Sequence, residues 1–461
     1  MLMESVVPSI MPLRLKHLGA SNTTTGLMLT SIPLLFGAIV NPIVSVKSDR
    51  HRGPWGRRIP FILYTLPFLV ISLIGLGFAE RLGSWAAVEF GVESPREVAI
   101  ATIAIFILAF TFFNSFVTSV FWYLFNDVVP EPLLARFMSV FRLFSMGSQA
   151  LYSFFVFQYA GAHSAEILAG AGLLYFFGFG LMCLNVKEGQ YPPPSPYIGN
   201  ERGPGSAVRT FVKECLSLPH YWFQFLSALF MSLSYANAIF AIFFYQSTGL
   251  DLQQIGIVQG SISLAAGALI PWSGWLADRF HPLRIVIAGY LVTILLAIPA
   301  TFIWFFWHPV PKIAFLAWLV ISIVFTAPAA ALIGICDPPL LMRIFPRDRY
   351  GQFCSANALL RSVGGIIGGV LCGAFFDLLK AHVPPQRVYC YTAVWQLVFM
   401  IPSLFFLVKL YQSWKRYGGD ASYVPPLPSH VSMQVNTGRD AEPGMIATQG
   451  TTDASDSFSL K

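Results

Sequence analysis

Charged residues are scarce in this chain. Asp, Glu, Lys and Arg make up 11% of its 461 residues, whereas 55% are hydrophobic and 15% are aromatic. A water-soluble protein of this length needs more charge to cover its surface. The composition therefore excludes a chain that faces mainly water, and it predicts that a lipid bilayer covers most of the surface.

Common motifs of enzyme and cofactor chemistry are also absent. The sequence contains no GxxxxGK[ST] loop for ATP, no HExxH and no GxSxG. Its six cysteines are scattered through apolar segments without CxxC spacing, so we interpret them as small core residues. We therefore expect no enzyme activity, no metal site and no cofactor.

The net charge of +7 does not indicate a nucleic-acid partner. The Lys and Arg residues lie between apolar runs and not in a cluster on one polar surface. Nucleic-acid binding needs such a cluster. The pattern is typical instead of basic loops that flank membrane helices.

Long apolar runs dominate what the sequence does contain. A helix of about 20 apolar residues crosses the hydrocarbon core of a bilayer. Eleven segments qualify, at roughly 25–46, 59–79, 98–126, 137–158, 165–186, 218–245, 253–276, 284–306, 312–336, 353–376 and 388–410. The glycines between Gly364 and Gly373 lie in one of them and predict close helix packing. We predict an all-α, multi-pass membrane protein.

The basic connections predict how the chain is oriented. Lys and Arg are concentrated in every second connection, for example between residues 47 and 58, whereas the connection at 80–97 carries glutamates. By the positive-inside rule, the basic connections and the C-terminus are cytoplasmic. We expect the protein to reside in an inner membrane, meaning the cytoplasmic or plasma membrane.

This orientation places the start of the helix at 25–46 outside the cell. An earlier helix must therefore bring the chain across, yet only a short apolar run precedes Arg14, Lys16 and His17. We predict that Met1 lies inside a first membrane helix that is partial here, and that the true start is upstream.

Two stretches of different composition divide the chain. A Pro- and Gly-rich stretch at 189–206 predicts a central loop, and the polar sequence after Trp414 predicts a disordered tail. We predict an N-terminal bundle at 1–186, a cytoplasmic loop at 187–217, a C-terminal bundle at 218–411 and a cytoplasmic tail at 412–461.

An internal repeat relates the two predicted bundles. The segment from Gly26 to Arg50 aligns with the segment from Gly256 to Arg279. The matched positions are Ser31 with Ser261, Gly37 with Gly267, Pro42 with Pro271, and Asp49-Arg50 with Asp278-Arg279. Repeated helix bundles of this kind enclose a site near the bilayer midplane and rock against each other to give alternating access. The repeat therefore predicts transport.

The first basic connection carries the most specific motif, NPIVSVKSDRHRGPWGRRIPF, from Asn41 to Phe61. This stretch resembles the signature of major facilitator transporters, and it most resembles the glycoside, pentoside and hexuronide cation symporters and the sucrose:proton symporters. The matching residues are Asp49, Arg50, Gly56, Arg57, Arg58 and Pro60. The resemblance implies the major facilitator fold, with two six-helix bundles, and secondary transport.

We interpret this turn as a gate. Guanidinium groups on a tight, Gly-bearing turn can pair with carboxylates and helix C-termini, and so close the cytoplasmic side in one state. The predicted gating residues are Asp49, Arg50, Gly56, Arg57 and Arg58, with Asp278 and Arg279 in the second half. The alternative is that these residues serve only as a positive-inside anchor.

Polar side chains inside apolar helices are costly and therefore indicate function. The candidates for binding substrate or a proton are Glu4, Asn114, Arg142, Asp337, Asn357 and Arg361. Arg142 occupies a place similar to that of an intramembrane arginine in the glycoside symporters. The alternative for Asp337 and Asp127 is that they pair with cytoplasmic arginines and hold the fold, and for Asp127 we favour this alternative.

Other amide and aromatic side chains suit an uncharged polar ligand. They are Asn114, Trp122, Tyr123, Asn126, Gln149, Gln224, Tyr235, Asn237, Gln246, Gln259 and Asn357. The resembled sodium-coupled symporters carry two acidic residues where this chain has Gly37 and Asn41. The chain therefore lacks an obvious cage for a hard cation, which favours a proton as coupling ion or uncoupled movement.

The leading hypothesis is a proton-coupled symporter of a sugar or glycoside that works as a monomer. The first alternative is a transporter of another solute, such as a drug, a peptidoglycan fragment or an organic acid. The second is a transporter-like protein that senses or scaffolds and moves nothing. In each case we expect a lipid bilayer and, for transport, a small polar solute as partners.

Overall fold

The computed structural model describes residues 2–189, 215–270, 276, 279–307, 310–346 and 350–426. These residues are almost entirely helical, and ten helices within them are long and apolar enough to cross a membrane. The predicted all-α membrane class is therefore confirmed. The predicted central loop and C-terminal tail lie largely outside the described residues.

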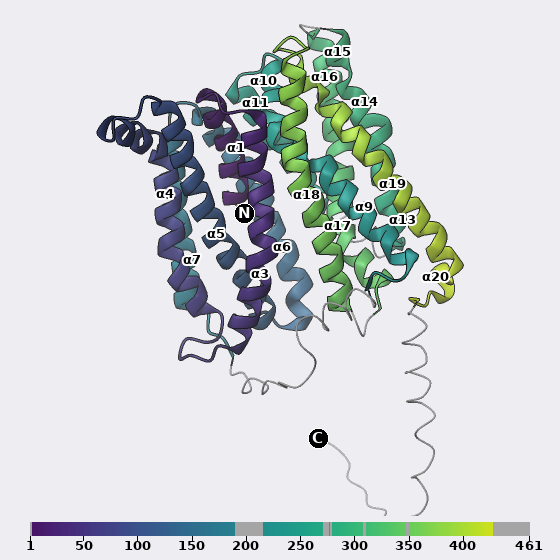
Figure 1. The fold of residues 1–461 in the computed structure, drawn as a ribbon. Coiled ribbons are helices and arrows are strands. Elements are labelled where there is room, and N and C mark those ends of the chain that lie inside the picture. Colours follow the sequence, from purple (N-terminus) through teal and green to yellow (C-terminus); the bar gives the residue numbers. More distant parts are fainter. Residues whose placement is uncertain are drawn as a thin grey trace, which may run out of the picture.

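One group of helices precedes the central connection and forms a bundle (Figure 1). Its elements are α1 (Leu2–His17), α2 (Asn22–Gly26), η1 (Leu27–Ser31), α3 (Ile32–Arg50), α4 (Ile59–Glu89), α5 (Pro95–Val128), α6 (Glu131–Leu151), η2 (Tyr152–Val156), η3 (Phe157–Tyr159) and α7 (Ser164–Asn185). The segment at 2–17 is helical, as expected for a first membrane helix.

The second group follows the connection and forms the other bundle (Figure 1). Its first elements are α9 (Pro219–Tyr235), η4 (Ala236–Phe240), α10 (Ala241–Ser247), α11 (Leu252–Ala268), α13 (Pro282–Val292), η5 (Thr293–Ala297), α14 (Ile298–Thr301) and α15 (Ile303–Phe306). Its last elements are α16 (Lys312–Ile321), η6 (Ser322–Thr326), α17 (Ala327–Ile344), α18 (Tyr350–Lys380), η8 (Val388–Tyr391), α19 (Thr392–Arg416) and α20 (Gly419–Ser422).

Helices α4 and α5 are longer than the apolar segments that predicted them. Both continue past the ends of those segments, so that Glu80 and Glu89 lie in α4, Glu97 lies in α5, and only a short turn joins the two helices. The predicted connection at 80–97 is therefore wrong in extent. Hydropathy marks where a helix leaves the hydrocarbon, whereas a helix ends only where its backbone hydrogen bonds end.

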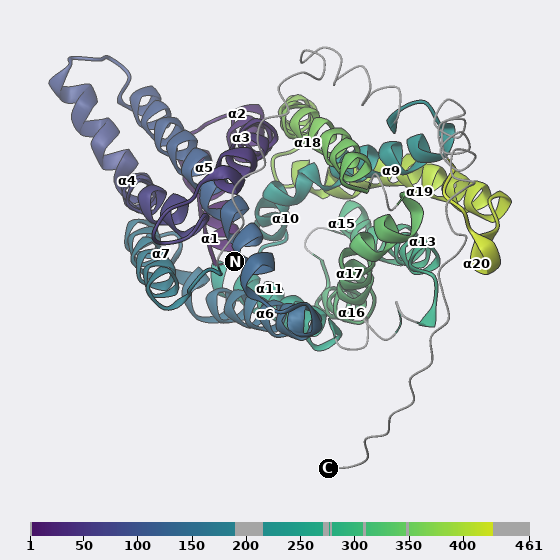
Figure 2. The ribbon, with the colours of Figure 1, turned by 90° about the horizontal axis from the view of Figure 1, so that it is seen from below.

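The two bundles meet along two seams. Figure 2 shows α2 and α3 beside α18, and α6 beside α11. The helices approach closely because glycines line the first seam: a side chain at Gly26 would overlap the Gly369 carbonyl, and one at Gly373 would overlap Asn22. This confirms the predicted packing role of the glycines on α18.

Each bundle has two distinguishable ends. We call the end that carries Asn22 and the far end of α18 the Asn22 end, and the opposite end, where α3 passes into α4, the Arg57 end. The hydrogen bonds that join the bundles among the described residues come from Asn22, Thr23 and Ser31. The described polar links between bundles therefore lie on the α2 and η1 part of the first seam.

Candidate transport cavity and gating turn

A cavity of about 310 Å³ lies between the bundles. Its first wall comes from α1, α6 and η2, and its second wall comes from η4, α10 and α11. The lining residues are Ser5, Pro8, Ser9, Gln149, Tyr152, Ser153, Ala238, Ile239, Ala241, Ile242, Tyr245, Gln259, Ile262 and Ser263. Both halves of the chain therefore contribute to a single cavity.

The polar groups of this cavity are hydroxyls and amides. None of the lining residues that the structure describes is Asp, Glu, Lys, Arg or His. Ser9 Oγ and the Tyr152 hydroxyl lie 2.8 Å apart and share a hydrogen bond, which joins α1 to η2 across one wall. Hydroxyl and amide groups both donate and accept hydrogen bonds, so the described lining suits a neutral polar solute.

The spacing of these residues along their helices explains why they face the cavity together. Ser5 and Ser9 are four residues apart on α1, and Gln259 and Ser263 are four apart on α11. Residues four apart lie on the same face of an α-helix. Helix α11 begins after Asp251, whose carboxylate accepts from Gln254 N at 2.7 Å and caps the helix.

An ion pair lies within the C-terminal bundle. Arg361 Nη1 on α18 and Asp337 Oδ2 on α17 are 3.0 Å apart, and their side chains are 50% and 30% exposed. The structure thus brings together two of the candidate residues, which are 24 positions apart in the sequence.

Asn357 precedes Arg361 by one helical turn. Its side chain is buried, and its Oδ1 accepts no hydrogen bond from the described residues. The buried Gln224 on α9 has a similarly unpartnered Oε1. Buried amide oxygens normally have a partner, so both groups can accept a further donor.

Asn114 and Arg142 are not among the described lining residues of the cavity. Asn114 Oδ1 on α5 accepts from the Tyr175 hydroxyl on α7 at 3.1 Å, within the N-terminal bundle. Arg142 is half-buried on α6 and forms no ion pair with another described residue. The side chain of Glu4 lies outside the described part of the structure. Substrate or proton binding by these residues stays a prediction.

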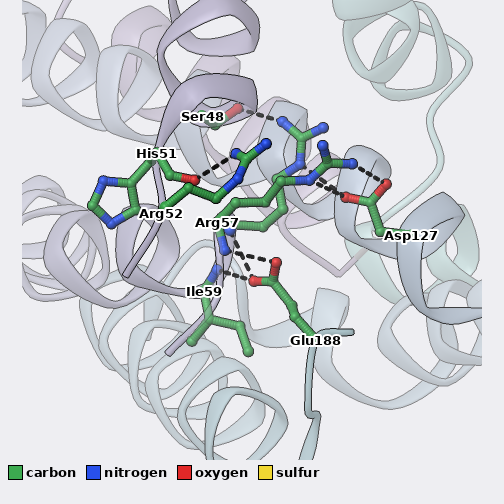
Figure 3. Close-up of polar contacts among 8 residues, drawn as sticks. Ser48, His51, Arg52, Arg57, Ile59, Asp127 and Glu188 are labelled. Carbon is green, nitrogen blue, oxygen red and sulfur yellow. Dashed lines mark hydrogen bonds and ion pairs between the residues drawn. The ribbon is translucent and has the colours of Figure 1, made fainter. Parts of the chain in front are cut away.

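The turn between α3 and α4 carries the arginines of the sequence motif (Figure 3). Arg57 holds both oxygens of Asp127, with Nη2 to Oδ1 at 2.6 Å and Nε to Oδ2 at 3.0 Å. Arg58 Nε lies 3.1 Å from the same carboxylate, and Arg58 Nη1 donates to Ser48 Oγ. Asp127 lies at the end of α5, so the structural role favoured for it from the sequence matches these contacts.

Arg58 also lies over an aromatic ring. Its guanidinium carbon is 5.0 Å from the ring centre of Tyr123, and the Arg58 residue is only 5% exposed. A guanidinium group over an aromatic face is attracted to it, most strongly when water is excluded. Arg58 is therefore held by α3 and α5 together.

Glu188 completes the turn, just beyond the end of α7. Its Oε2 accepts from Arg57 N at 2.8 Å, and its Oε1 accepts from Arg58 N at 2.8 Å and Ile59 N at 2.7 Å (Figure 3). A carboxylate is well placed there, because the first backbone N–H groups of a helix lack partners and carry partial positive charge. Glu188 thereby anchors the start of α4 to α7.

Gly56 makes this contact possible. Its φ of +96° lies in the left-handed region, and a side chain at this position would overlap the Glu188 carboxyl group. Glycine alone meets both conditions without strain. The turn is tight, as expected from the sequence, with Gly56 N donating to Gly53 O at 3.1 Å.

The contacts described for this turn belong to the N-terminal bundle. The side chains of Asp49 and Arg50, and all of Asp278, lie outside the described part of the structure. Arg279 lies over the ring of its neighbour Phe280, 6.0 Å from the ring centre. Gating between the two halves by these residues stays a prediction.

Comparison with known proteins identifies the family. The model of the Major Facilitator Superfamily matches residues 1–369 and 221–414. The chain belongs to this superfamily. Among curated proteins, this facilitator is 35% identical over 66 residues to the sucrose transport protein SUT1 of Oryza sativa subsp. japonica. That match covers 14% of this chain and only 12% of the rice protein.

Solved structures show the same fold over most of the length. The facilitator resembles a D-xylose-proton symporter with a TM-score of 0.61 and 14% identity, covering 88% of this chain and 91% of that one. It also resembles a bacterial homolog of the human lysosomal transporter Spinster, with a TM-score of 0.59 and 16% identity, covering 89% and 92%. The predicted major facilitator fold is confirmed.

Sequence reasoning missed several residues of the cavity and the turn. Ser5, Ser9, Tyr152 and Ser263 line the cavity, but isolated Ser and Tyr residues in membrane helices are common and give no signal by themselves. The available signal was a spacing of four residues, which separates Ser5 from Ser9 and Ser263 from the named amide Gln259. Glu188 gave none, because its partners are backbone groups far away in the sequence.

Proposed function

We propose that this facilitator carries a small neutral polar solute, a sugar or glycoside, across the membrane by alternating access. The observation that carries the proposal is the cavity between the bundles, whose described lining residues offer hydroxyls and amides from both halves, with no charged side chain among them. A solute bound there contacts both bundles at once. Rocking of one bundle against the other then changes the side to which the solute is exposed.

Sugars fit this lining by their chemistry. Each sugar hydroxyl donates and accepts a hydrogen bond, as do the facing groups of Gln149 and Gln259. Tyr152 and Tyr245 add aromatic faces, on which the apolar side of a sugar ring can stack. The short match to a sucrose transport protein supports this class of solute.

The coupling ion in this proposal is a proton, and Asp337 is its acceptor. In the unprotonated state Asp337 pairs with Arg361 at 3.0 Å, and protonation removes the charge that holds the pair. The pair is partly exposed, so a proton can reach it. At the position where related symporters carry an acidic residue, the Asn41 Oδ1 accepts from Ser119 Oγ at 2.7 Å, which gives this amide a structural role.

The Arg57 end faces the cytoplasm in this proposal. The arginines of the turn satisfy the positive-inside rule there, and the C-terminus then lies on the same side of an inner membrane. A single chain forms the complete cavity, which supports a monomeric transporter.

Uptake of radiolabelled sucrose and other neutral glycosides into cells, with and without a proton uncoupler, tests the proposal. We expect accumulation that the uncoupler abolishes. The variants Gln149→Ala and Gln259→Ala should raise the half-saturating concentration, and Asp337→Asn should permit exchange but not uphill accumulation. Accumulation that survives the uncoupler contradicts proton coupling.

Two further outcomes separate the alternatives. Flux of a charged solute and none of any glycoside contradicts the neutral-solute assignment. The absence of all flux from a folded, membrane-inserted protein favours a sensor. Arg142→Ala adds a test of the sequence-based site, since we expect lost transport with intact insertion, and unchanged uptake removes Arg142 from the site.

A further inference from the structure

A single carboxylate joins the two bundles at the Asn22 end. Asp377, near the end of α18, accepts from Asn22 N at 3.0 Å through Oδ1. Its Oδ2 accepts from Thr23 N and from Thr23 Oγ1, both at 2.8 Å. The three donors lie at the start of α2 in the N-terminal bundle, so every one of these bonds crosses the interface.

The neighbours of Asp377 reinforce this link. The Tyr389 hydroxyl donates to Asn22 Oδ1 at 3.0 Å, which is a further bond across the interface. Lys16 of α1 lies 4.3 Å from the ring centre of Phe243 in the opposite bundle. Lys380 Nζ lies 3.2 Å from Asp377 Oδ1 and balances part of the negative charge.

The geometry of α2 explains why a carboxylate is needed here. The helical run that begins at Asn22 continues through η1 into α3, and its first N–H groups have no partner within the helix. They carry partial positive charge, and a negative charge from the facing bundle satisfies them. Gly373 lets α18 approach α2 closely enough for this contact, since a side chain at Gly373 would overlap Asn22 and Thr23.

We infer that Asp377 is the latch of the Asn22 end, and that it sets the balance between the state in which this end is closed and the state in which it is open. Rocking of the bundles separates α2 from α18, so the three bonds to Asp377 break in each cycle. The inference rests on alternating access, which is part of the proposed function, but not on the identity of the solute or the coupling ion.

The test measures the latch directly. Spin labels are placed at Glu93→Cys and His382→Cys, one exposed position on each bundle at this end, in a chain whose six native cysteines are replaced. Distances are recorded by pulsed electron paramagnetic resonance in lipid nanodiscs without any solute. We expect Asp377→Ala to raise the ratio of open to closed molecules by about tenfold or more, because it removes three bonds to a charged acceptor.

A matched control separates the latch from general damage. Asp251 also caps a helix, but its partner Gln254 lies in the same bundle. We expect Asp251→Ala to leave the distance distribution unchanged. An Asp377→Ala distribution identical to the unsubstituted one, in a monodisperse protein, overturns the inference, and so does an equal shift in Asp251→Ala.

A milder variant keeps the test decisive if Asp377→Ala does not fold. Thr23→Val removes only the hydroxyl bond, so we expect a shift of about threefold in the same direction. In the double variant, Thr23→Val should add little to Asp377→Ala, because both act through one contact. Additive shifts contradict a shared latch. If the protein transports no sugar but the variants change the measured distances as expected, the proposed solute is wrong and the inference about Asp377 still holds.

Discussion

Two carboxylates in this molecule each accept hydrogen bonds from the backbone N–H groups at the start of a helix. Glu188 accepts from the backbone N–H groups of Arg57, Arg58 and Ile59 at the start of α4. Asp377 accepts from the N–H groups of Asn22 and Thr23 at the start of α2. Glu188 belongs to the same bundle as the helix that it caps, whereas Asp377 belongs to the opposite bundle.

The difference separates a structural contact from a conformational one. In a rocking-bundle transporter each bundle moves as a body, so a contact within one bundle persists through the cycle. A contact across the interface must break and form again. In the proposed cycle, the described contacts of Arg57, Arg58 and Glu188 therefore stabilise the N-terminal bundle in every state, whereas the Asp377 contact stabilises only the state that is closed at the Asn22 end.

The largest effect is expected at the pairing of Arg57 and Arg58 with Asp127. Asp127→Ala leaves two largely buried guanidinium groups without their carboxylate, and we expect a loss of about 3 kcal/mol in the free energy of unfolding. Denaturation of the purified protein in detergent measures it. Asp420→Ala is the control, because its pair with Arg284 is exposed and its loss should leave the free energy of unfolding nearly unchanged. Equal losses in both variants contradict the comparison.

Glu188→Gln should have the next largest effect. The amide keeps one acceptor but loses the negative charge that faces three N–H groups, so we expect a loss of about 2 kcal/mol. Hydrogen exchange followed by mass spectrometry should show faster exchange at residues 57–59. Unchanged protection there shows that Glu188 does not hold the start of α4.

Gly56→Ala tests the contact between Glu188 and the turn by changing the turn. A left-handed residue with a side chain is strained, and here the side chain also displaces the Glu188 carboxyl group, so we expect a loss of about 2 kcal/mol. Gly91→Ala is a matched control, since Gly91 also has a positive φ of 62° but no atom within 4 Å of the added methyl group. The excess loss at Gly56 over Gly91 measures the contact with Glu188. No excess means that the turn tolerates displacement of Glu188.

The sequence predicted the fold class because hydropathy alone separates lipid-facing helices from loops. It also predicted the arginine turn and the structural pairing of Asp127, since buried charges at helix ends need partners. It did not predict the length of α4, because Glu80, Arg81 and Glu89 interrupt the apolar pattern in the last turns of this helix.

The cavity and the latch depend on contacts that no local pattern encodes. Asp337 and Arg361 were each named from the sequence, but their pairing follows from how the C-terminal bundle places α17 relative to α18. Asp377 looks like an ordinary helix-end residue, and its partners are backbone groups 354 and 355 positions away. Such partners become visible only when the two bundles are placed together.

The smallest effect on the free energy of unfolding is expected for Asp377→Ala, although this variant should shift the conformation of the bundles. Asp377→Ala destabilises the state that is closed at the Asn22 end, but the molecule can then populate the state that is open there, which is equally folded. The free energy of unfolding therefore falls by no more than the gap between the two states, and we expect a loss below about 1 kcal/mol. A loss as large as that of Glu188→Gln, measured in the same denaturation assay, means that Asp377 holds the fold rather than the gate.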